Sequence, residues 1–219
     1  MDVMKVCGLS TVEGARQCVA GGATHLGFIF FPKSPRNVTP EQAADLVDAM
    51  PAAERAKVQT VAVTVDADAA VLDRIEATLD PDMHQLHGKE TVEHIKTLKQ
   101  RTGKPVIKAL AIRDAEDLER LAQYDGVADL FLLDAKPPAG SDLPGGNGVS
   151  FDWSLVAGLK TKTPILLSGG LDATNVAKAR ALVDHEANGL IGLDVSSGVE
   201  AAPGVKDADK IKMFLAHAV

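Results

Sequence analysis

The chain has 219 residues, of which 46% are hydrophobic and 24% charged, and its formal net charge is −7. This length can fold as one domain around a sizeable core, and we expect a single domain over residues 1–219. An acidic chain has no general attraction to nucleic acid or to an anionic membrane surface, and no apolar stretch approaches the roughly 20 residues that span a bilayer. The composition therefore predicts neither a nucleic-acid nor a membrane partner.

The two cysteines, Cys7 and Cys18, are too few for a disulfide framework. A reducing compartment is the simplest setting for two thiols. The chain reaches strand-like sequence directly after its first residues, which predicts that there is no signal peptide. We therefore expect a cytoplasmic protein.

Short apolar runs alternate with longer amphipathic stretches along the chain. Eight runs predict strands, at residues 4–7, 25–30, 59–65, 83–86, 105–109, 130–133, 165–168 and 189–193. Helical spacing predicts helices at residues 11–20, from 39 onward, 67–79, 91–101, 114–123, 172–183 and 207–218. Ser10 or Thr11 can cap the first helix. Thr39 can cap the second, with Pro40 at its first position and Gln42 placed for a capping box.

Strands that alternate with helices imply a parallel sheet. Eight such units in this length predict a compact α/β fold, a single (β/α)8 TIM barrel. A doubly wound open sheet is the alternative fold. In a barrel the active site lies at the carboxyl ends of the strands, and this rule selects one set of side chains. The set is Cys7, residues 31–36, His87, Asp134, residues 168–170 and residues 194–198.

Cys7 and Asp134 each belong to the end of an apolar, strand-like run. A thiolate can accept a proton and a partly desolvated carboxyl can donate one, so the two predict acid–base catalysis at one site. Gly8 would let the backbone turn sharply beside the thiol. The alternative for Cys7 is a buried small hydrophobe, which is the commoner fate of a free cysteine and the one we expect for Cys18.

Two further side chains at the strand ends are candidate ligand contacts. Arg36 follows two prolines that would stiffen its loop, and its planar guanidinium matches a carboxylate or a phosphate. The alternative is a rigid surface loop with solvated charges. His87 shares a strand face with Gln85, which we place at the barrel mouth, whereas His84 would point to the opposite face. The histidines show no metal-ligand spacing, so no metal is expected.

The loops after the seventh and eighth strands offer backbone amides and hydroxyls to an anion. In a TIM barrel these two loops together form the usual phosphate site, and the helix predicted from Asp172 would add positive potential. The candidate contacts are Gly169, Gly170, Asp194, Ser196, Ser197 and Gly198. For the first loop, a turn with a capping aspartate is the alternative interpretation.

A long Gly/Pro-rich stretch follows Asp134 and contains residues 145–148. Connections of this length are usually functional or disordered, so this one is a candidate mobile lid, with a floppy surface loop as the alternative. The chain has no Walker loop and no G-x-G-x-x-G after a strand, so neither an ATP site nor a dinucleotide site is predicted.

Six segments, in this order, resemble the phosphoribosylanthranilate isomerase family of the tryptophan pathway: KVCGLS, LGFIFFPKSPRNVTPEQA, QLHG, LLDAKPP…PGGNGVSFDW, LLSGGL and GLDVSSGVE…PGVKD. They extend from residue 5 to residue 207, and it is their combination that is specific. The resemblance implies an Amadori rearrangement of N-(5′-phosphoribosyl)anthranilate to 1-(2-carboxyphenylamino)-1-deoxyribulose 5-phosphate.

The resemblance also implies roles for the candidate residues. Asp134 would be the general acid that protonates the furanose ring oxygen, and Cys7 the general base that removes the C2′ proton. Arg36 would hold the anthranilate carboxylate. The phosphate would lie on Gly170, Ser197, Gly198 and neighbouring amides. No metal and no organic cofactor is needed, the implied partner is a small phosphorylated aminosugar, and the family implies a monomer or a homodimer.

Three positions depart from the pattern of this family. Asn147 stands where the glycine-rich loop usually has threonine. Asp66 replaces the more usual asparagine after the third strand, and His84 replaces an apolar residue. None of them belongs to the acid–base pair, so the departures concern the loop, the charge of the site and helix packing.

Other functions stay open at this point. A histidine-pathway aminoaldose isomerase performs the same rearrangement on a larger substrate, but that family resembles a barrel with paired aspartates and two phosphate sites, whereas Cys7 takes the base position here. A catalytically silent phospho-ligand-binding barrel is a second alternative, which the presence of both Cys7 and Asp134 disfavours. A cysteine-based redox protein is a poorer third, because the chain lacks C-x-x-C.

Overall fold

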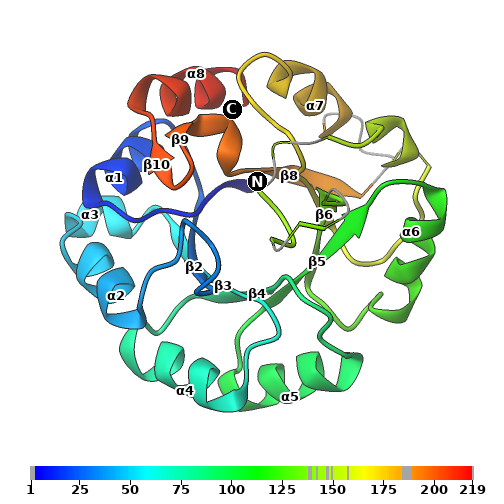
Figure 1. The fold of residues 1–219 in the computed structure, drawn as a ribbon, viewed down its shortest axis with the longest axis horizontal. Coiled ribbons are helices and arrows are strands. Elements are labelled where there is room, and N and C mark those ends of the chain that lie inside the picture. Colours follow the sequence, from blue (N-terminus) through cyan, green and yellow to red (C-terminus); the bar gives the residue numbers. More distant parts are fainter. Residues whose placement is uncertain are drawn as a thin grey trace.

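The computed structural model describes residues 3–137, 140–141, 143–146, 148, 150–156, 158–183 and 189–218. Eight parallel strands follow one another in chain order and close into a barrel, which Figure 1 shows from one end, with helices around it. The strands are β1 (Val3–Cys7), β2 (His25–Phe30), β3 (Gln59–Thr64), β4 (Met83–Leu86), β5 (Val106–Ile112), β6 (Leu130–Ala135), β7 (Ile165–Leu167) and β8 (Leu190–Val195). The predicted TIM barrel is confirmed, and the open doubly wound sheet is excluded.

The α-helices are α1 (Val12–Ala20), α2 (Pro40–Asp48), α3 (Ala52–Arg55), α4 (Ala69–Thr78), α5 (Val92–Thr102), α6 (Ala115–Glu119), α7 (Val176–Val183) and α8 (Ala208–Ala218). Short 3-10 helices are η1 (Arg120–Gln123), η2 (Trp153–Val156) and η4 (Ser197–Val199). After β8, the strands β9 (Glu200–Ala202) and β10 (Val205–Lys206) form an antiparallel pair. The sequence analysis did not predict α3, η2 or this pair, because each is too short to show a hydrophobic period.

Two elements differ from their predicted bounds in ways that concern the site. Strand β6 continues through Asp134, which pairs with Ala111 of β5, so this carboxylate is held by the sheet rather than by a loop. The helix predicted from Asp172 begins four residues later. The Asp172 carboxylate accepts hydrogen bonds from the amide and hydroxyl of Thr174, and its carbonyl accepts from the Val176 amide at 3.0 Å, so Asp172 caps an irregular turn that leads into α7.

The two helix starts predicted from capping residues, at Thr11 and Thr39, are confirmed by their caps. The Thr11 hydroxyl accepts a hydrogen bond from the Gly14 amide at the start of α1. At α2 the Thr39 hydroxyl accepts from the Gln42 amide, and the Gln42 side chain accepts from the Thr39 amide. This reciprocal capping box satisfies two backbone donors that the helix itself leaves without partners.

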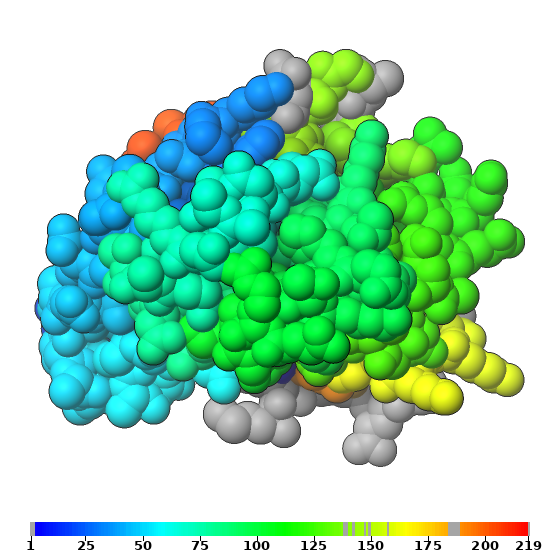
Figure 2. Space-filling view, turned by 90° about the horizontal axis from the view of Figure 1, so that it is seen from below, coloured from blue at the N-terminus to red at the C-terminus, as the bar shows by residue number. Residues whose placement is uncertain are grey.

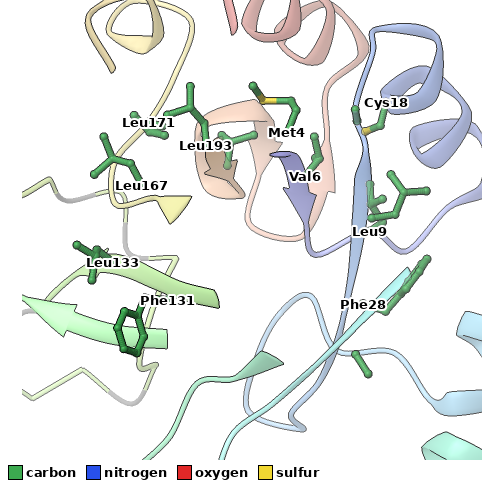
Figure 3. Close-up of a cluster of buried hydrophobic side chains, with 14 of the residues drawn as sticks. Met4, Val6, Leu9, Cys18, Phe28, Phe131, Leu133, Leu167, Leu171 and Leu193 are labelled. Atoms are coloured by element: carbon green, nitrogen blue, oxygen red, sulfur yellow. The ribbon is translucent and has the colours of Figure 1, made fainter. Parts of the chain in front are cut away.

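Successive side chains of each strand point alternately into and out of the barrel, and this creates two apolar layers. Side chains such as Val61, Ile107 and Leu132 point into the barrel, and the outer layer lies between the strands and the helices. Figure 3 shows part of the outer layer, which includes Phe28 and Cys18. Cys18 is fully buried there, as predicted for a small hydrophobe.

The loops after β2 and β6 lie at the same end of the barrel. In Figure 2 the segment after β2, in blue, and the segment after β6, in yellow-green, meet at the top of the molecule. A hydrogen bond joins them, since Arg36 Nη2 donates to the Gly146 carbonyl at 3.4 Å. Parallel strands of one closed sheet all end on this side, so residues far apart in sequence converge here.

We expect Thr39→Ala to lower the free energy of unfolding by about 1 kcal/mol, because the α2 capping box loses its hydroxyl acceptor. Urea unfolding followed by circular dichroism measures the change. The matched control is Thr97→Ala, the same substitution at an exposed position inside α5, where alanine is the better helix former. An equal loss in both variants would contradict the assigned role of the cap.

Candidate active site

A cavity opens at the carboxyl ends of the strands. Among the predicted site residues, its lining contains Cys7, Arg36, His87, Asp134, Gly169, Gly170, Asp194, Ser196 and Ser197. Gly198 is outside the lining: it packs against the carbonyl of Leu171 so closely that a Cβ would have no room. The barrel thus brings together all but one of the predicted residues.

Strand β1 places Cys7 at the edge of the cavity, and two glycines make space around it. The thiol lies over Gly27 of β2, where an added Cβ would come within 2.8 Å of Cys7 Sγ. Gly8 turns the chain with a φ of +79°, as the sequence predicts, and its amide donates to the Gly27 carbonyl. A Cβ on Gly8 would also lie 2.6 Å from Cδ of Arg36, so Gly8 leaves room for the arginine side chain.

The thiol of Cys7 experiences opposing influences. Burial raises its pKa because a thiolate is poorly solvated there, and the nearby charge of Asp194 raises it further. The positive charges of Lys5 and Lys206 act in the opposite direction and favour the thiolate, but burial prevails and the pKa of Cys7 lies above its ordinary value. Cys7 is free rather than disulfide-bonded, so a thiol is present at the cavity edge.

Asp134 lies across the cavity from β1 and is 7% exposed. Its Oδ1 accepts a hydrogen bond from the amide of Ala135, and Nε2 of His87 lies 3.4 Å from its Oδ2, close but without hydrogen-bond geometry. The other ring nitrogen of His87 is 3.2 Å from Nε2 of Gln85. These contacts fix the carboxylate and confirm that Gln85 and His87 share one strand face.

Gly145 closes over this pair. A Cβ at Gly145 would collide with Asp134 Oδ2 and approach His87 Cε1 to 2.9 Å. The described part of the glycine-rich loop therefore covers the carboxylate, which fits its predicted role as a lid. Asn147, one of the departures from the family pattern, lies outside the described residues.

Arg36 is held by a buried ion pair at the cavity rim. Its Nε and Nη2 donate to the two carboxylate oxygens of Glu200 at 2.7 and 2.8 Å. Lys206 Nζ donates to the same carboxylate at 2.9 Å. All three side chains are about 5% exposed or less. Glu200 therefore fixes one edge of the guanidinium and leaves the Nη1 end directed toward Gly146 and the cavity.

The two loops predicted to bind an anion lie side by side in the cavity wall. Gly169 and Gly170 adopt positive φ angles of 83° and 68°. The Asn175 side-chain amide donates to the Gly170 carbonyl at 2.8 Å and so holds the first loop. In the second loop the Ser196 hydroxyl donates to the Cys7 carbonyl at 3.0 Å. These contacts leave backbone amides along both loops to line the cavity.

Asp194 uses both of its carboxylate oxygens in hydrogen bonds within the protein. Its Oδ1 accepts from Lys5 Nζ at 2.7 Å, and its Oδ2 accepts from the Ser168 hydroxyl at 3.0 Å. A carboxylate bound in this way repels a phosphate, so Asp194 fits the cavity floor better than the predicted anion contact.

The sequence analysis missed three charged residues of the site: Lys5, Glu200 and Lys206. For Lys5 a signal existed, because it lies two residues before Cys7 on a strand and must share its face. Glu200 and Lys206 carried no signal, since only the β9–β10 pair turns their side chains back onto Arg36.

The remaining departures have local explanations. Asp66 adopts a φ of +47°, a left-handed conformation that Asp and Asn tolerate better than most residues. His84 points out of the barrel, as predicted, and its Nε2 lies 2.7 Å from Glu76 of α4. Within the described ranges, no three His, Cys, Asp or Glu side chains form a possible metal site, and no helix is long and apolar enough to cross a membrane.

Comparison with known proteins decides between the remaining functions. Residues 4–217 match the family model described as N-(5′-phosphoribosyl)anthranilate (PRA) isomerase. The chain belongs to the phosphoribosylanthranilate isomerase family. It is therefore an aldose–ketose isomerase of tryptophan biosynthesis, and the histidine-pathway, silent-barrel and redox alternatives are set aside.

Individual phosphoribosylanthranilate isomerases agree over nearly the whole chain. The enzyme of Rhizobium meliloti is 54% identical over 211 residues, which cover 96% of this chain and 94% of that protein. The crystal structure from Thermotoga maritima superposes with a TM-score of 0.82 at 35% identity, covering 100% of this chain and 98% of that one. A structure in complex with reduced 1-(o-carboxyphenylamino)-1-deoxyribulose 5-phosphate has a TM-score of 0.80 at 33% identity, with the same coverage.

We expect Glu200→Gln to destabilise the protein by about 3 kcal/mol at pH 7, because Arg36 and Lys206 lose their counter-charge in a buried site. The effect must depend on pH. Burial opposes the charged form of Glu200, but hydrogen bonding from Arg36 and the charge of Lys206 outweigh it and lower the pKa. This stabilisation is complete above the unfolded pKa of about 4.3 and is lost as pH falls through the lower folded value.

Urea unfolding of wild type and Glu200→Gln between pH 7 and pH 3 measures this difference. The difference in the free energy of unfolding between the two proteins should narrow as the pH falls below about 4. A difference that stays constant over the whole pH range would show that the charge of Glu200 is not what stabilises the site.

Proposed function

We propose that this chain rearranges N-(5′-phosphoribosyl)anthranilate to 1-(2-carboxyphenylamino)-1-deoxyribulose 5-phosphate, with Asp134 as general acid and Cys7 as general base. The observation that carries the proposal is the arrangement of one cavity: a carboxyl and a thiol face it from β6 and β1, with an arginine at the rim and two amide-rich loops in its wall. A carboxylated, phosphorylated aminosugar has a carboxylate for the arginine, a phosphate for the two loops and a sugar for the carboxyl and the thiol.

Asp134 supports the first step as proton donor. Protonation of the furanose ring oxygen lets the C1′–O bond break, and the nitrogen lone pair then forms an iminium with C1′. The Asp134 side chain is buried beneath Gly145 and fixed by the Ala135 amide, so water competes poorly for its proton. His87 beside it can hydrogen-bond the sugar or the carboxyl group.

Cys7 supports the second step as proton acceptor. The iminium at C1′ acidifies the C2′ proton, so a modest base such as a thiolate can remove it. The proton passes to Cys7 Sγ, and the electron pair of the C2′–H bond forms the C1′–C2′ double bond while the π pair of the iminium returns to nitrogen. The resulting enol becomes the ketone when its hydroxyl loses a proton and C1′ gains one. The residues of the chain supply both proton transfers, and the steps as written require no metal or organic cofactor.

The two ends of the substrate fit two parts of the cavity. The anthranilate carboxylate would bind the Nη1 end of Arg36, which Glu200 leaves directed inward. The phosphate would bind amides and hydroxyls at Gly169, Gly170, Ser196 and Ser197, with Gly198 shaping the loop from behind. The ribose then lies between Cys7 and Asp134.

We also propose a cytoplasmic enzyme, a single domain over residues 1–219 that acts as a monomer or homodimer. Both cysteines are free thiols, and a catalytic thiol requires a reducing compartment. One isomerase of this family, from Thermotoga maritima, is dimeric, and its structure was determined in a monomeric form. Size-exclusion chromatography with light scattering separates the two assemblies for this chain.

We expect Cys7→Ala and Asp134→Asn each to lower kcat by about 10²–10⁴-fold, the usual contribution of one acid–base group. Turnover of phosphoribosylanthranilate formed in situ is followed by loss of anthranilate-type fluorescence. Cys18→Ala, which removes the other, fully buried thiol outside the cavity, is the control and should keep the wild-type kcat. Wild-type kcat in Cys7→Ala at saturating substrate would reject the base assignment.

We expect Arg36→Ala to raise KM by tenfold or more and to change kcat much less, because the arginine binds a carboxylate remote from the reacting carbons. The matched control is Arg16→Ala, which breaks a comparable two-bond pair with Glu54 on the exposed surface. A drop in kcat with an unchanged KM would instead place Arg36 at the reacting atoms.

A further inference from the structure

Lys5 is a buried charge to which the acid–base scheme above gives no role. It is fully buried inside the barrel, two residues before Cys7 on β1. Alternate residues of a strand point to the same face, so Lys5 lies beneath Cys7 and on the same side of the sheet. An ammonium in such a place is costly unless it is paired, and its position requires a physical reason.

Three neighbouring strands hold this ammonium in place. Lys5 of β1 is in register with Asp194 of β8, and the Lys5 Nζ–Asp194 Oδ1 distance is 2.7 Å. The second oxygen of Asp194 accepts from the hydroxyl of Ser168, directly after β7. The carboxylate is thereby fixed from both sides, and it fixes the position of the ammonium below the thiol.

A second buried lysine shows what a purely structural pair looks like in this barrel. Lys108 of β5 donates to Glu90 at 2.9 Å and to the carbonyls of Leu86 and Gly88 at 3.2 and 2.8 Å. These bonds join β5 to the end of β4 and to Glu90 before α5, on the opposite side of the barrel from β1 and Cys7. Lys5 differs because its surroundings include a reacting thiol.

The electrostatic coupling between Lys5 and Cys7 is mutual. Burial and Asp194 raise the pKa of Cys7, whereas Lys5 lowers it through its charge and through side-chain hydrogen bonding. Burial alone would lower the pKa of Lys5, but the charges of Asp194 and Cys7 outweigh it and raise that pKa. The ammonium and the thiolate therefore stabilise each other. The other titratable or charged groups around this part of the cavity are Lys206, Arg36, Glu200, His87 and Asp134. His25 of β2 is in register with Lys5, and burial and the charge of Lys5 lower the pKa of its imidazole to about 4, so it is neutral over the pH range of the test.

We propose that Lys5 is a positioning residue for the isomerisation: its buried ammonium, held below the thiol by Asp194 and Ser168, favours the thiolate form of Cys7 that accepts the C2′ proton. The inference rests on the proposed role of Cys7 as the base. It assigns the Lys5–Asp194 pair a function in the reaction in addition to its contribution to barrel closure.

The test is the pH dependence of Cys7 alkylation by iodoacetamide in wild type and Lys5→Met, read by mass spectrometry of tryptic peptides. Trypsin cleavage after Arg16 places Cys7 and Cys18 in different peptides. We expect the Cys7 midpoint in Lys5→Met to move to higher pH by about one unit or more, with about a tenfold lower rate near neutral pH. Cys18, which is fully buried, stays unreacted while the protein is folded and reports unfolding.

Asp194→Asn provides a readout that a structural role would not produce. It removes the negative charge that raises the pKa of Cys7. It also removes the carboxylate partner of Lys5, so the ammonium can interact more strongly with the thiolate. We expect the alkylation midpoint to move to lower pH, opposite to Lys5→Met. Loosened packing alone would move the Cys7 alkylation midpoint of both variants in the same direction.

Lys108→Met is the matched control, because it removes the other buried lysine from its carboxylate partner. Its Cys7 midpoint should equal that of wild type. An unshifted or lowered midpoint in folded Lys5→Met, or an equal shift in Lys108→Met, overturns the proposal. Alkylation of Cys18 in Lys5→Met would show that this variant is unfolded, and the test then depends on Asp194→Asn. In that case an unchanged or raised Cys7 midpoint in Asp194→Asn overturns the proposal.

Turnover separates failure of this inference from failure of the proposed base. In Lys5→Met the acidic limb of kcat/KM should move to higher pH together with the alkylation midpoint. Loss of activity in Cys7→Ala without any response of Cys7 to Lys5→Met rejects only the role of Lys5. Wild-type kcat in Cys7→Ala rejects the base, whatever the alkylation shows.

Discussion

The ion pair between Lys5 and Asp194 lies at the seam where the first strand meets the last and the barrel closes. In the reaction we propose, a thiol base must be sheltered from water and yet ionised, and burial by itself works against the thiolate. A neighbouring ammonium, held by a carboxylate from the other side of the seam, offsets part of this effect.

The rim of the cavity uses the same principle. Arg36 and Lys206 share the carboxylate of Glu200, so two buried cations are held together with a net positive charge facing an anionic ligand. The guanidinium is oriented before a ligand arrives, which lowers the entropic cost of binding. Glycines at positions 8, 27 and 145 leave the space in which these side chains and the thiol approach one another.

Sequence-based prediction was accurate where the signal was local and periodic. The strands were placed correctly because buried parallel strands are continuous apolar runs, and α1 and α2 because Thr11 and Thr39 are strong caps. It was less accurate at the start of α7, where an irregular turn capped by Asp172 precedes the helix, and it missed β9 and β10, which are too short to show a period.

The sequence by itself determined the barrel and, through the combination of its motifs, the family, and it located candidate site residues at the strand ends. This was possible because alternating strands and helices imply one strand polarity and one end of the barrel for the site. Only the tertiary structure decided how the charges of the site are balanced. Lys5 and Asp194 are 189 residues apart, and Arg36 and Glu200 are 164 apart. No spacing rule connects such positions, since their contact exists only once the barrel has closed.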